Sequence, residues 1–549
     1  MKQYNGTLAI FLFISLSYSQ DDEISEGYYP GNNFAIDDYI IAHDNPNFDE
    51  FTEHGARNVI AGLDFDQDGK GEILFTIDEG ITPGGFDPGL VGIYLYEANP
   101  ASGEYEYVWK FVSPEPAVSL PAMTHGDMDQ DGNPEIYFGV PPQVTYNDQT
   151  WGTYIFESNS NGEFSDPTLL YQYGLEVTDN FRLTGFDLAD VDGDGKVELV
   201  TIERGGKRLS IDQLVGDDLD EQSSFQTELL TEEGGEILAG GSPYNVDIVD
   251  FDEDGLMEIW VNTWDNFSFA IWEATGPDEY VLQNDLNSLY IEGDPGSFNS
   301  QGFSFVDVDG DGHLEAWFMM TNCRLYYLDS SPEGTDPTGV DMIDASYFYD
   351  VLSVWEGTNA QVCRGSDVQD IDGNGDLDII VSAGVDEKIM RLELVGDDPT
   401  IESSYEISMV LDAEDEGSPS DRFYPLDISE NDLDGDGKTE IVLTNIFAAD
   451  PGQPSVFILE YAFIYIPDDN FEQALIDFGY DDVLDDYVLA ENISGVTELN
   501  VESKGISDLT GIEGFTSLVS LICEQNELTS IDVSNNTALT NLWCQFNNL

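Results

Sequence analysis

One short acidic loop recurs seven times along this chain, and its oxygen atoms could bind a hard metal ion. The loop has the pattern Asp-x-Asp-x-Asp/Asn-Gly-x-x-Glu/Asp, so positions 1, 3, 5 and 9 carry side-chain oxygens and position 6 is glycine. Calcium takes oxygen ligands at alternate positions, with glycine where the chain turns sharply. The pattern therefore predicts a calcium site in each copy. The copies start at Asp64, Asp127, Asp190, Asp250, Asp307, Asp370 and Asp432.

The acid at position 9 distinguishes these loops from the EF-hand. An EF-hand supplies its last carboxylate at position 12, whereas position 12 here is Phe75, Phe138, Thr201, Val261, Phe318, Val381 and Leu443. A solvated acidic turn is the other alternative. It would hold four carboxylates within a few ångströms, where each pair repels by roughly 1 kcal/mol or more. A bound cation removes this repulsion, so we expect metal loops.

The chain has an extreme negative charge. Its 549 residues include 111 Asp and Glu against 16 Lys and Arg, for a formal net charge of −95. Such a field repels phosphates and anionic lipids, which argues against nucleic-acid and membrane-surface partners. Seven divalent ions would offset only a small part of the charge, so the rest suits an acidic surface in salty water. The 41% hydrophobic content still predicts a folded protein.

The first residues predict export. Lys2 precedes an apolar run from Leu8 to Leu16, and small residues come next, so residues 1–19 are expected to be a cleaved signal peptide. The run is too short to span a bilayer, which needs about 20 apolar residues. We therefore expect a secreted or cell-surface protein without membrane insertion. Whether Cys323 and Cys363 form a disulfide is left open.

The loops start 57 to 63 residues apart, which indicates a repeat architecture. Each period shows four strand-like segments, as in 58–62, 73–76, 92–97 and 105–111. Four antiparallel strands in each of seven repeats predict an all-β fold, a seven-bladed β-propeller, which leaves only short sheet edges open. We assign it to residues 20–466. The seventh repeat is short of a strand, so the segment Phe34–Ala42 is expected to supply it and close the ring.

The loops resemble the FG-GAP/VCBS family of propeller repeats, which is best known from integrin α-subunit heads. The resemblance covers about residues 50–465 and rests on seven in-phase copies of the motif. It implies that each loop joins the innermost strand of a blade to the second strand. It also implies calcium on the face opposite the usual ligand face, held by the acids at positions 1, 3, 5 and 9 and by the carbonyl at position 7.

The ligands implied by the resemblance number five in each loop. They are Asp64, Asp66, Asp68, Lys70 and Glu72; Asp127, Asp129, Asp131, Asn133 and Glu135; Asp190, Asp192, Asp194, Lys196 and Glu198; Asp250, Asp252, Asp254, Leu256 and Glu258; Asp307, Asp309, Asp311, His313 and Glu315; Asp370, Asp372, Asn374, Asp376 and Asp378; and Asp432, Asp434, Asp436, Lys438 and Glu440. The sixth loop departs from the others at Asn374 and Asp378. One charge fewer and a shorter final carboxylate predict the weakest site there.

Residues 467–549 carry a different repeat. Its pattern, Leu-x-x-Leu-x-Cys-x-x-Asn-x-Leu, is typical of leucine-rich repeats, with one strand and one turn per rung. From residue 466 onward, the sequence resembles the leucine-rich modules of large secreted surface proteins of Gram-negative bacteria. The chain stops in mid-repeat, so we expect a longer solenoid. The repeat places Leu518, Leu521, Cys523, Asn526 and Leu528 in register with Leu539, Leu542, Cys544, Asn547 and Leu549, and a degenerate rung precedes them at Leu499, Val501, Ile506 and Leu509.

A helical cap is expected at the start of this second module. Asp468 can cap a short helix that ends at Gly479 and carries Phe471, Leu475 and Phe478 on one face. The two cysteines of the repeat fall in equivalent positions of neighbouring rungs. We therefore expect them to be stacked core thiols.

Four arginines lie a few residues before a loop, where an inner strand is predicted to start on the face opposite the metals: Arg57, Arg182, Arg364 and Arg422. Basic residues are scarce, so one interpretation of this placement is a mouth that binds an acidic glycan or a carboxylate. The alternative is that these arginines are counter-ions for surplus acids. The long segments 77–90 and 140–152 are expected on the same face, with Phe86, Tyr146 and Trp151 as candidate contacts.

No enzymatic constellation emerges from the sequence. It has no Gly-x-Ser-x-Gly, no His-Glu-x-x-His and only four histidines. We therefore expect a secreted calcium-binding protein that acts in adhesion or in binding a protein or glycan, without catalysis. The alternative is a polysaccharide-degrading lyase or hydrolase on a calcium-stabilised propeller, because nothing among the 111 acids marks or dismisses a catalytic pair.

Overall fold

The chain was studied as a computed structural model, which describes residues 28–30, 55–140, 152–170, 183–230, 243–285, 300–329, 347–350, 365–445 and 456–549, with gaps inside several of these ranges. Strands dominate the described residues up to 461, and the helices lie after them. No helix among the described residues is long and apolar enough to cross a membrane. The predicted signal peptide, Cys323 and Cys363 lie outside the described residues.

The strands form seven four-stranded antiparallel sheets. In chain order they are β2 (Gly55–Leu63), β3 (Glu72–Asp78), β6 (Val91–Asn99) and β7 (Glu104–Val112); β8 (Met123–Gly126), β9 (Glu135–Val140), β10 (Gly152–Glu157) and β11 (Thr168–Leu170); β12 (Leu183–Ala189), β13 (Glu198–Glu203), β14 (Arg208–Leu214) and β15 (Phe225–Leu229); β16 (Pro243–Val249), β17 (Glu258–Thr263), β18 (Phe269–Gly276) and β19 (Glu279–Asp285); β20 (Ser300–Val306), β21 (Glu315–Met320), β22 (Arg324–Asp329) and β23 (Tyr347–Asp350); β24 (Gly365–Gln369), β25 (Asp378–Ala383), β26 (Lys388–Leu394) and β27 (Tyr405–Asp412); and β28 (Phe423–Ile428), β29 (Glu440–Asn445), β30 (Val456–Tyr461) and β1 (Tyr28–Pro30).

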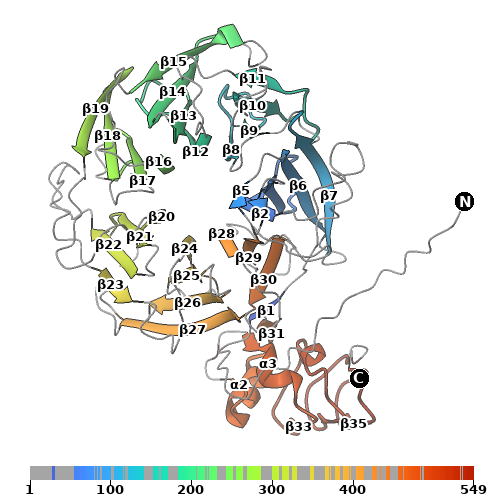
Figure 1. Ribbon diagram of the computed structural model, residues 1–549. Helices are drawn as coiled ribbons and strands as arrows, with labels where there is room; N and C mark the ends of the chain where they lie inside the picture. The colour runs from blue at the N-terminus through green and yellow to red at the C-terminus, as the bar shows by residue number, and fades with distance from the viewer. Residues whose placement is uncertain are drawn as a thin grey trace, which may run out of the picture.

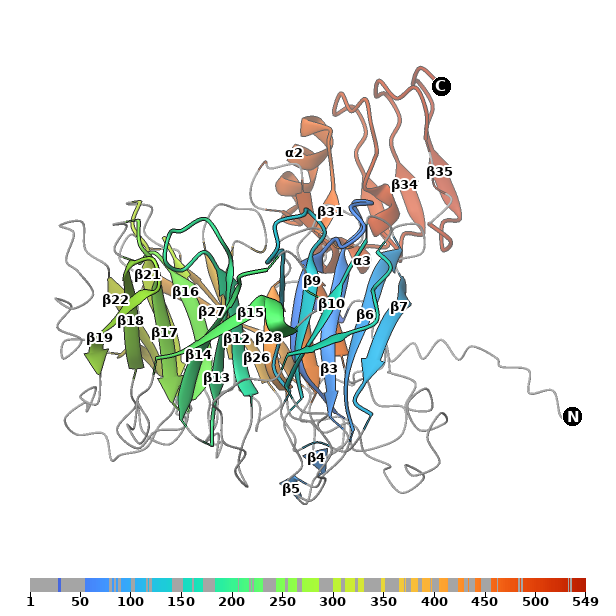
Figure 2. The ribbon, with the colours of Figure 1, turned by 90° about the horizontal axis from the view of Figure 1, so that it is seen from above.

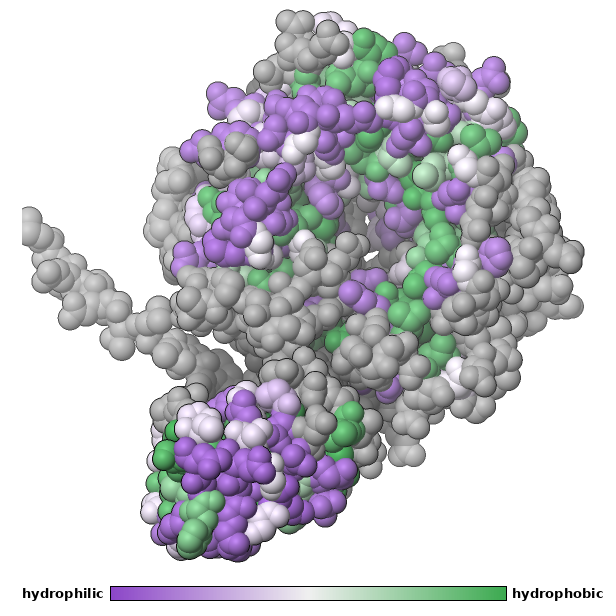
Figure 3. Space-filling model, turned by 180° about the vertical axis from the view of Figure 1, so that it is seen from behind, coloured by the Kyte–Doolittle hydropathy of each residue, from purple (hydrophilic) through white to green (hydrophobic). Residues whose placement is uncertain are grey.

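The sheets stand around a common axis, which is the arrangement of a β-propeller (Figure 1). The first strand of each sheet lies innermost, and neighbouring first strands contact each other, as β8 does with β12 and β28 does with β2. Figure 3 shows the ring from the other side, hollowed at its centre. The prediction of an all-β propeller is therefore confirmed.

An N-terminal strand completes the seventh sheet. β1 pairs antiparallel with β30, with Tyr28 opposite Tyr461 and Pro30 opposite Leu459. Proline has no N–H to donate to a strand ladder, so within sheets it is found on edge strands such as this one. The segment Phe34–Ala42, for which this role was predicted, lies outside the described residues. The edge position of the seventh sheet is thus occupied by β1, which lies upstream of the predicted segment.

Each second strand starts at the last acid of its loop, one residue earlier than expected. The apolar residues after this acid are buried on both faces, since the neighbouring sheets cover them. In β3, Ile73, Leu74 and Phe75 are all 0% exposed. Every loop therefore leads into a strand held between two sheets, which gives the loop a rigid base.

Small elements connect the strands of the first and third sheets. The segment between β3 and β6 contains a two-stranded hairpin, β4 (Ile81–Thr82) and β5 (Gly85–Phe86). Because β3 runs away from its loop, this hairpin lies at the opposite end of the sheet (Figure 2), as predicted for the segment 77–90. A short 3-10 helix, Gln222–Ser224, precedes β15.

The C-terminal part has a separate core. β31 (Phe463–Tyr465) pairs with β32 (Tyr487–Leu489), and α2 (Asp469–Phe478) and α3 (Ala490–Ser494) flank them. A parallel sheet comes next, made of β33 (Glu498–Asn500), β34 (Ser520–Ile522) and β35 (Asn541–Trp543), with a 3-10 helix at Ile512–Gly514. One apolar cluster joins the helices to the stacked turns.

The predicted helix is present with both its caps. Asp468 accepts hydrogen bonds from the backbone N–H groups of Asn470 and Phe471, and Gly479 adopts a left-handed φ of 76° at the C-terminal end. Phe471 and Leu475 are fully buried. Phe478 differs from the prediction, because 44% of its side chain is exposed.

Asparagines bond the turns of the stacked rungs. Asn526 accepts hydrogen bonds from the N–H groups of residues 504–506 and donates to the carbonyls of Val501 and Cys523. Asn547 repeats this role one rung later, donating to the carbonyls of Cys523 and Cys544. The two cysteines are free thiols in adjacent rungs, as expected. Burial, together with Cys544, raises the pKa of Cys523 to about 11.

The third sheet contains a buried acid beside the second sheet. Asp212 is 0% exposed, and its Oδ1 accepts a hydrogen bond from the Thr227 hydroxyl. Its strand partner Leu199 belongs to an apolar cluster that includes residues of the second sheet. The other oxygen of Asp212 and the nearby hydroxyls of Ser210 and Thr201 find no partner among the described residues. Burial raises the pKa of Asp212 to about 7.

We expect Asp212→Asn to change the pH dependence of folding. The carboxyl keeps its proton up to about pH 7 when folded, but releases it near its ordinary pKa of 3.8 when unfolded. The stability contributed by this group therefore falls as the pH rises from about 4 to 7. The variant cannot ionise, so it should exceed the parent by on the order of 2–4 kcal/mol at pH 8 and match it near pH 4. Urea unfolding at both pH values measures this.

The exposed Asp166→Asn serves as the control for the loss of one charge. It should shift stability by a few tenths of a kcal/mol at most, as is typical of surface substitutions. Parallel stability curves for Asp212→Asn and the parent between pH 4 and 8 would contradict the interpretation.

Candidate metal site

In the first five loops, the first acid closes a tight turn. Its Oδ2 accepts a hydrogen bond from the backbone N–H of the glycine at position 6, at 2.9 to 3.1 Å in the first five loops. These glycines have φ values of 84° to 93°, a left-handed conformation that other residues adopt with strain. The acids concerned are Asp64, Asp127, Asp190, Asp250 and Asp307.

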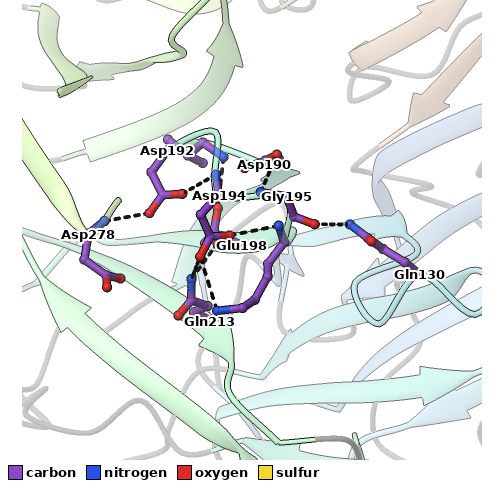
Figure 4. A network of polar contacts seen from close by, with 10 residues as sticks. Gln130, Asp190, Asp192, Asp194, Gly195, Glu198, Gln213 and Asp278 are labelled. Atoms are coloured by element: carbon purple, nitrogen blue, oxygen red, sulfur yellow. Dashed lines mark hydrogen bonds and ion pairs between the residues drawn. The ribbon is translucent and has the colours of Figure 1, made fainter. Parts of the chain in front are cut away.

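The acids at positions 3 and 5 also accept hydrogen bonds from the loop backbone. In the third loop, Asp192 accepts from the N–H of Asp194 at 3.0 Å, and Asp194 accepts from the N–H of Lys196 at 2.9 Å. The first two loops repeat both bonds. These bonds turn the carboxylates toward one side of the loop. Ligand oxygens of Asp190, Asp192 and Asp194 lie within 4.8 Å of one another (Figure 4).

The last acid ties the exit of the loop to its entrance. One of its oxygens accepts a hydrogen bond from the backbone N–H at position 2, at 2.6 to 3.0 Å in every loop where both residues are described. The side chain is buried, as for Glu72 at 2% and Glu135 at 0% exposure. The second oxygen of Glu135 receives no hydrogen bond from the described residues. In the second loop, a buried carboxylate oxygen is therefore left available for a cation.

Burial also governs the charge of these acids. It raises the pKa of Glu72 to about 7, of Glu135 to about 8 and of Glu198 to about 7, and the neighbouring loop acids raise them further. Hydrogen bonds from the loop backbone oppose this rise but do not cancel it. A divalent cation at the centre of the loop would restore full ionisation. The donor set, made of oxygens only, fits a hard cation.

The loops of neighbouring sheets are linked by side chains at position 4. Gln67 donates a hydrogen bond to the carbonyl of Gly132 at 3.4 Å, and Gln130 donates to the carbonyl of Gly195 at 3.0 Å (Figure 4). A further link joins the third loop to the fourth sheet, where the N–H of Asp278 donates to Asp192 at 2.7 Å. Sequence reasoning missed these links, because position 4 varies among the copies.

A second set of acids, also missed, lies on the third strand opposite the last acid of the loop in six sheets, and the third sheet has Gln213 there. Like charges opposite each other destabilise a sheet unless a cation lies between them. Their distance from the loop varies from 14 residues (Glu315 to Asp329) to 25 residues (Glu72 to Glu97), so no fixed spacing reveals them in the sequence. The strand pairs are Glu72–Glu97, Glu135–Glu157, Glu198–Gln213, Glu258–Glu273, Glu315–Asp329, Asp378–Glu393 and Glu440–Glu460.

In the first and third sheets, the residue opposite the last acid contacts a side chain of the loop. Lys70 lies 2.6 Å from Asp68 and 2.8 Å from Glu97, so its ammonium joins the loop to the third strand. In the third sheet, the neutral Gln213 donates to Glu198 at 3.0 Å and to Asp194 at 3.4 Å (Figure 4). The lysine is about a third exposed, where an ion pair contributes at most about 1 kcal/mol.

Acids also line the axis of the ring. Asp187, Asp247 and Asp367 come from innermost strands at one register, each opposite the third residue of its second strand. Asp187 accepts hydrogen bonds from the N–H groups of Leu188 and of Ile248 in the next sheet. Burial raises the pKa of Asp247 well above its ordinary value, and the charges of the other two acids add to the rise.

Several predicted site residues cannot be placed. The side chains of Arg57, Arg182, Arg364 and Arg422 lie outside the described residues, although the backbone of Arg57 is on β2, near its start. Tyr146 and Trp151 lie outside them too. The same holds for the loop residues Asp252, Asp254, Asp309, Asp311, Asp370, Asp372, Asn374, Asp376, Asp432, Asp434, Asp436 and Lys438.

Comparisons with known proteins agree with this arrangement. A family described as FG-GAP-like repeat matches residues 127–201, which span the second and third loops. Internalin J of Listeria monocytogenes serotype 4b (strain F2365) is 38% identical over 73 residues, which are 13% of this chain and 8% of that protein. The chain thus spans a small part of the length of this curated relative.

Two solved structures are similar to this chain at low identity. The periplasmic gluconolactonase of Pseudomonas aeruginosa is 11% identical, with 64% of this chain and 94% of that chain covered and a TM-score of 0.40. The V. cholerae biofilm matrix protein Bap1 is 12% identical, with 80% and 91% covered and a TM-score of 0.39. Likenesses this remote do not indicate an activity.

We expect Asp127→Ala to destabilise the protein even when a chelator is present. The substitution removes the acceptor for two backbone N–H groups, those of Asp131 at 3.0 Å and Gly132 at 2.9 Å. The loss should be about 1–2 kcal/mol of unfolding free energy, measured by urea denaturation in excess chelator. A variant that matches the parent in chelator would show that these bonds do not hold the loop without an ion.

Proposed function

We propose that the acidic loops bind calcium and that the protein is an exported, non-catalytic binding protein. The observation that supports calcium most directly is the repeated presence of buried carboxylate oxygens without a hydrogen-bond donor. Oε1 of Glu135, Oδ1 of Asp190 and Oδ1 of Asp307 all lack one among the described residues. A buried, unpaired carboxylate oxygen costs free energy unless a cation binds it.

Calcium fits these loops better than other common metals. The candidate ligands are carboxylate and carbonyl oxygens, and no cysteine or imidazole side chain occupies positions 1, 3, 5 or 9. Calcium takes six to eight such oxygens at flexible geometry, which suits a loop of nine residues. The bound ion would connect the loop to the second strand and would keep the last acid ionised. Its role is therefore structural.

The architecture that we propose has two modules. The seven sheets are the blades of one closed ring, completed by β1, and each blade carries one loop between its innermost and second strands. The C-terminal rungs form a leucine-rich-repeat solenoid, because the parallel strands and the asparagine-bonded turns recur at its period. Residues 1–19 direct export, which brings the loops into a calcium-rich medium.

Two broad surfaces suit the binding of macromolecules. A propeller and a solenoid each offer an extended face, and two such faces on one chain raise the apparent affinity for a large or repetitive ligand. The partner is a protein or a glycan outside the cell, and the activity is adhesion or binding. The sequence contains neither a Gly-x-Ser-x-Gly nor a His-Glu-x-x-His motif, which are signatures of serine hydrolases and zinc peptidases. A polysaccharide-degrading enzyme is the alternative function, because nothing among the acids marks or dismisses a catalytic pair.

Removal of calcium should lower the melting temperature of the protein substantially. In its absence, clustered carboxylates repel, and metal affinity becomes folding free energy where a site forms only on folding. Calorimetry in calcium and in excess chelator measures the shift. Asp129→Ala should cost more stability than Asn374→Ala, because it removes a charge from a fully acidic loop. An unchanged melting curve at low salt would refute calcium as a structural ion.

The binding function predicts a ligand face away from the loops. If Arg57, Arg182, Arg364 and Arg422 converge there, Arg364→Ala should weaken an acidic ligand about tenfold or more, because a charge-assisted bond contributes about 1.5–3 kcal/mol. Its calcium affinity should not change. A glycan array gives the readout, and a lyase assay on uronic-acid polymers is run alongside. Cleavage of a polymer would contradict the proposed binding function and would show that the protein is an enzyme.

A further inference from the structure

The sixth sheet contains a fully buried ion pair at the last acid of its loop. Nε of Arg391 lies 2.5 Å from Oδ1 of Asp378, and Nη2 lies 3.7 Å from Oε1 of Glu393. Arg391 is 1% exposed and Asp378 is 0% exposed. Arg391 projects from β26, the third strand, and Asp378 is the first residue of β25. A guanidinium group therefore lies beside the last acid of this loop, whereas in the second loop Oε1 of the last acid, Glu135, has no donor among the described residues.

Both oxygens of Asp378 are used by the protein itself. Oδ2 accepts the backbone N–H of Ile371 at 3.0 Å, which is the bond that the last acid makes in the other loops. Oδ1 is the counterpart of Oε1 in Glu135, which lacks a donor among the described residues. In the sixth sheet, Nε of Arg391 donates a hydrogen bond to this oxygen. The oxygen that would face a metal ion is already paired with a positive charge.

Two sequence differences coincide in this repeat. Position 9 is aspartate here and glutamate in the other six copies. Arg391 stands opposite Ile380, and the residues at that register in the other sheets are uncharged: Leu95, Ile155, Ile211, Ile271, Tyr327 and Ile458. The aspartate side chain is one methylene shorter, which leaves room for the planar guanidinium. Arginine also stays charged when buried, so it needs this carboxylate permanently.

We propose that Arg391 takes the place of the metal ion in the sixth repeat, so that this repeat is held by an internal cation and the other six bind calcium. The inference rests on the proposed calcium function. A calcium ion at Asp378 would have to displace the guanidinium or lie beside it, and both arrangements are unfavourable in a buried site. The substitution of aspartate for glutamate and the gain of arginine thus act together.

Calcium stoichiometry of the full chain tests the proposal. Calcium per chain is measured by elemental analysis after equilibration in a calcium buffer and removal of free ion. Asp192→Ala and Asp372→Ala remove the same position, position 3, from the third and sixth loops. We expect Asp192→Ala to lose one calcium per chain and Asp372→Ala to lose none. A loss of one calcium from Asp372→Ala overturns the proposal and leaves calcium binding by the other loops intact.

A paired variant tests the role of the arginine directly. Asp378→Glu combined with Arg391→Leu restores the residue types of the other repeats and should gain one calcium per chain. Adding Asp372→Ala to this variant should remove that ion again. If the paired variant folds, as judged by its circular dichroism, and gains no calcium, Arg391 is not the substitute. If the parent itself binds no calcium, the proposed function fails instead. If the paired variant does not fold, the comparison of Asp192→Ala with Asp372→Ala still decides.

Discussion

In six of the seven loops, one contact holds the two ends together: the hydrogen bond between the last acid and the backbone N–H at position 2. The acid is the first residue of a strand that lies between two neighbouring sheets, so its position is fixed by the core. By holding the entrance of the loop against this strand, the contact brings the acids at positions 1, 3 and 5 together. Burial of the same acid then makes its charge unfavourable without a cation. Fold and candidate site are thus linked through one carboxylate.

Much of this arrangement was predictable from the sequence. The apolar residues after each acid, such as Ile73 to Phe75, predict a strand, and the structure shows a strand there with these three residues fully buried. The glycine at position 6 predicts a left-handed turn, and Gly69 and Gly132 have it. Asp468 and Gly479 mark the ends of α2. These features are local, so residue type and spacing determine them.

The features that were missed depend on pairing between distant residues. Glu97 faces Glu72 only because of the register between β3 and β6, and the spacing between such partners varies from sheet to sheet. Arg391 looks like an ordinary surface arginine until its strand is placed beside β25. The exposed Phe478 shows the limit of a helical face, because it lies in the last turn, beyond the core that covers Phe471. Strand register, which places Glu97 and Arg391, depends on the whole sheet.

The glutamines at position 4 have a consequence for how the ring behaves as a whole. Gln67 and Gln130 each reach the carbonyl of the glycine at position 6 in the next loop, so the first three loops are mechanically continuous. From the third copy onward, position 4 is glycine or glutamate, and neither carries an amide to make this bond. A backbone hydrogen bond from the N–H of Gly71 to the carbonyl of Leu433, at 3.1 Å, also joins the first loop to the seventh, so distortion of one of these four loops is passed to its neighbour.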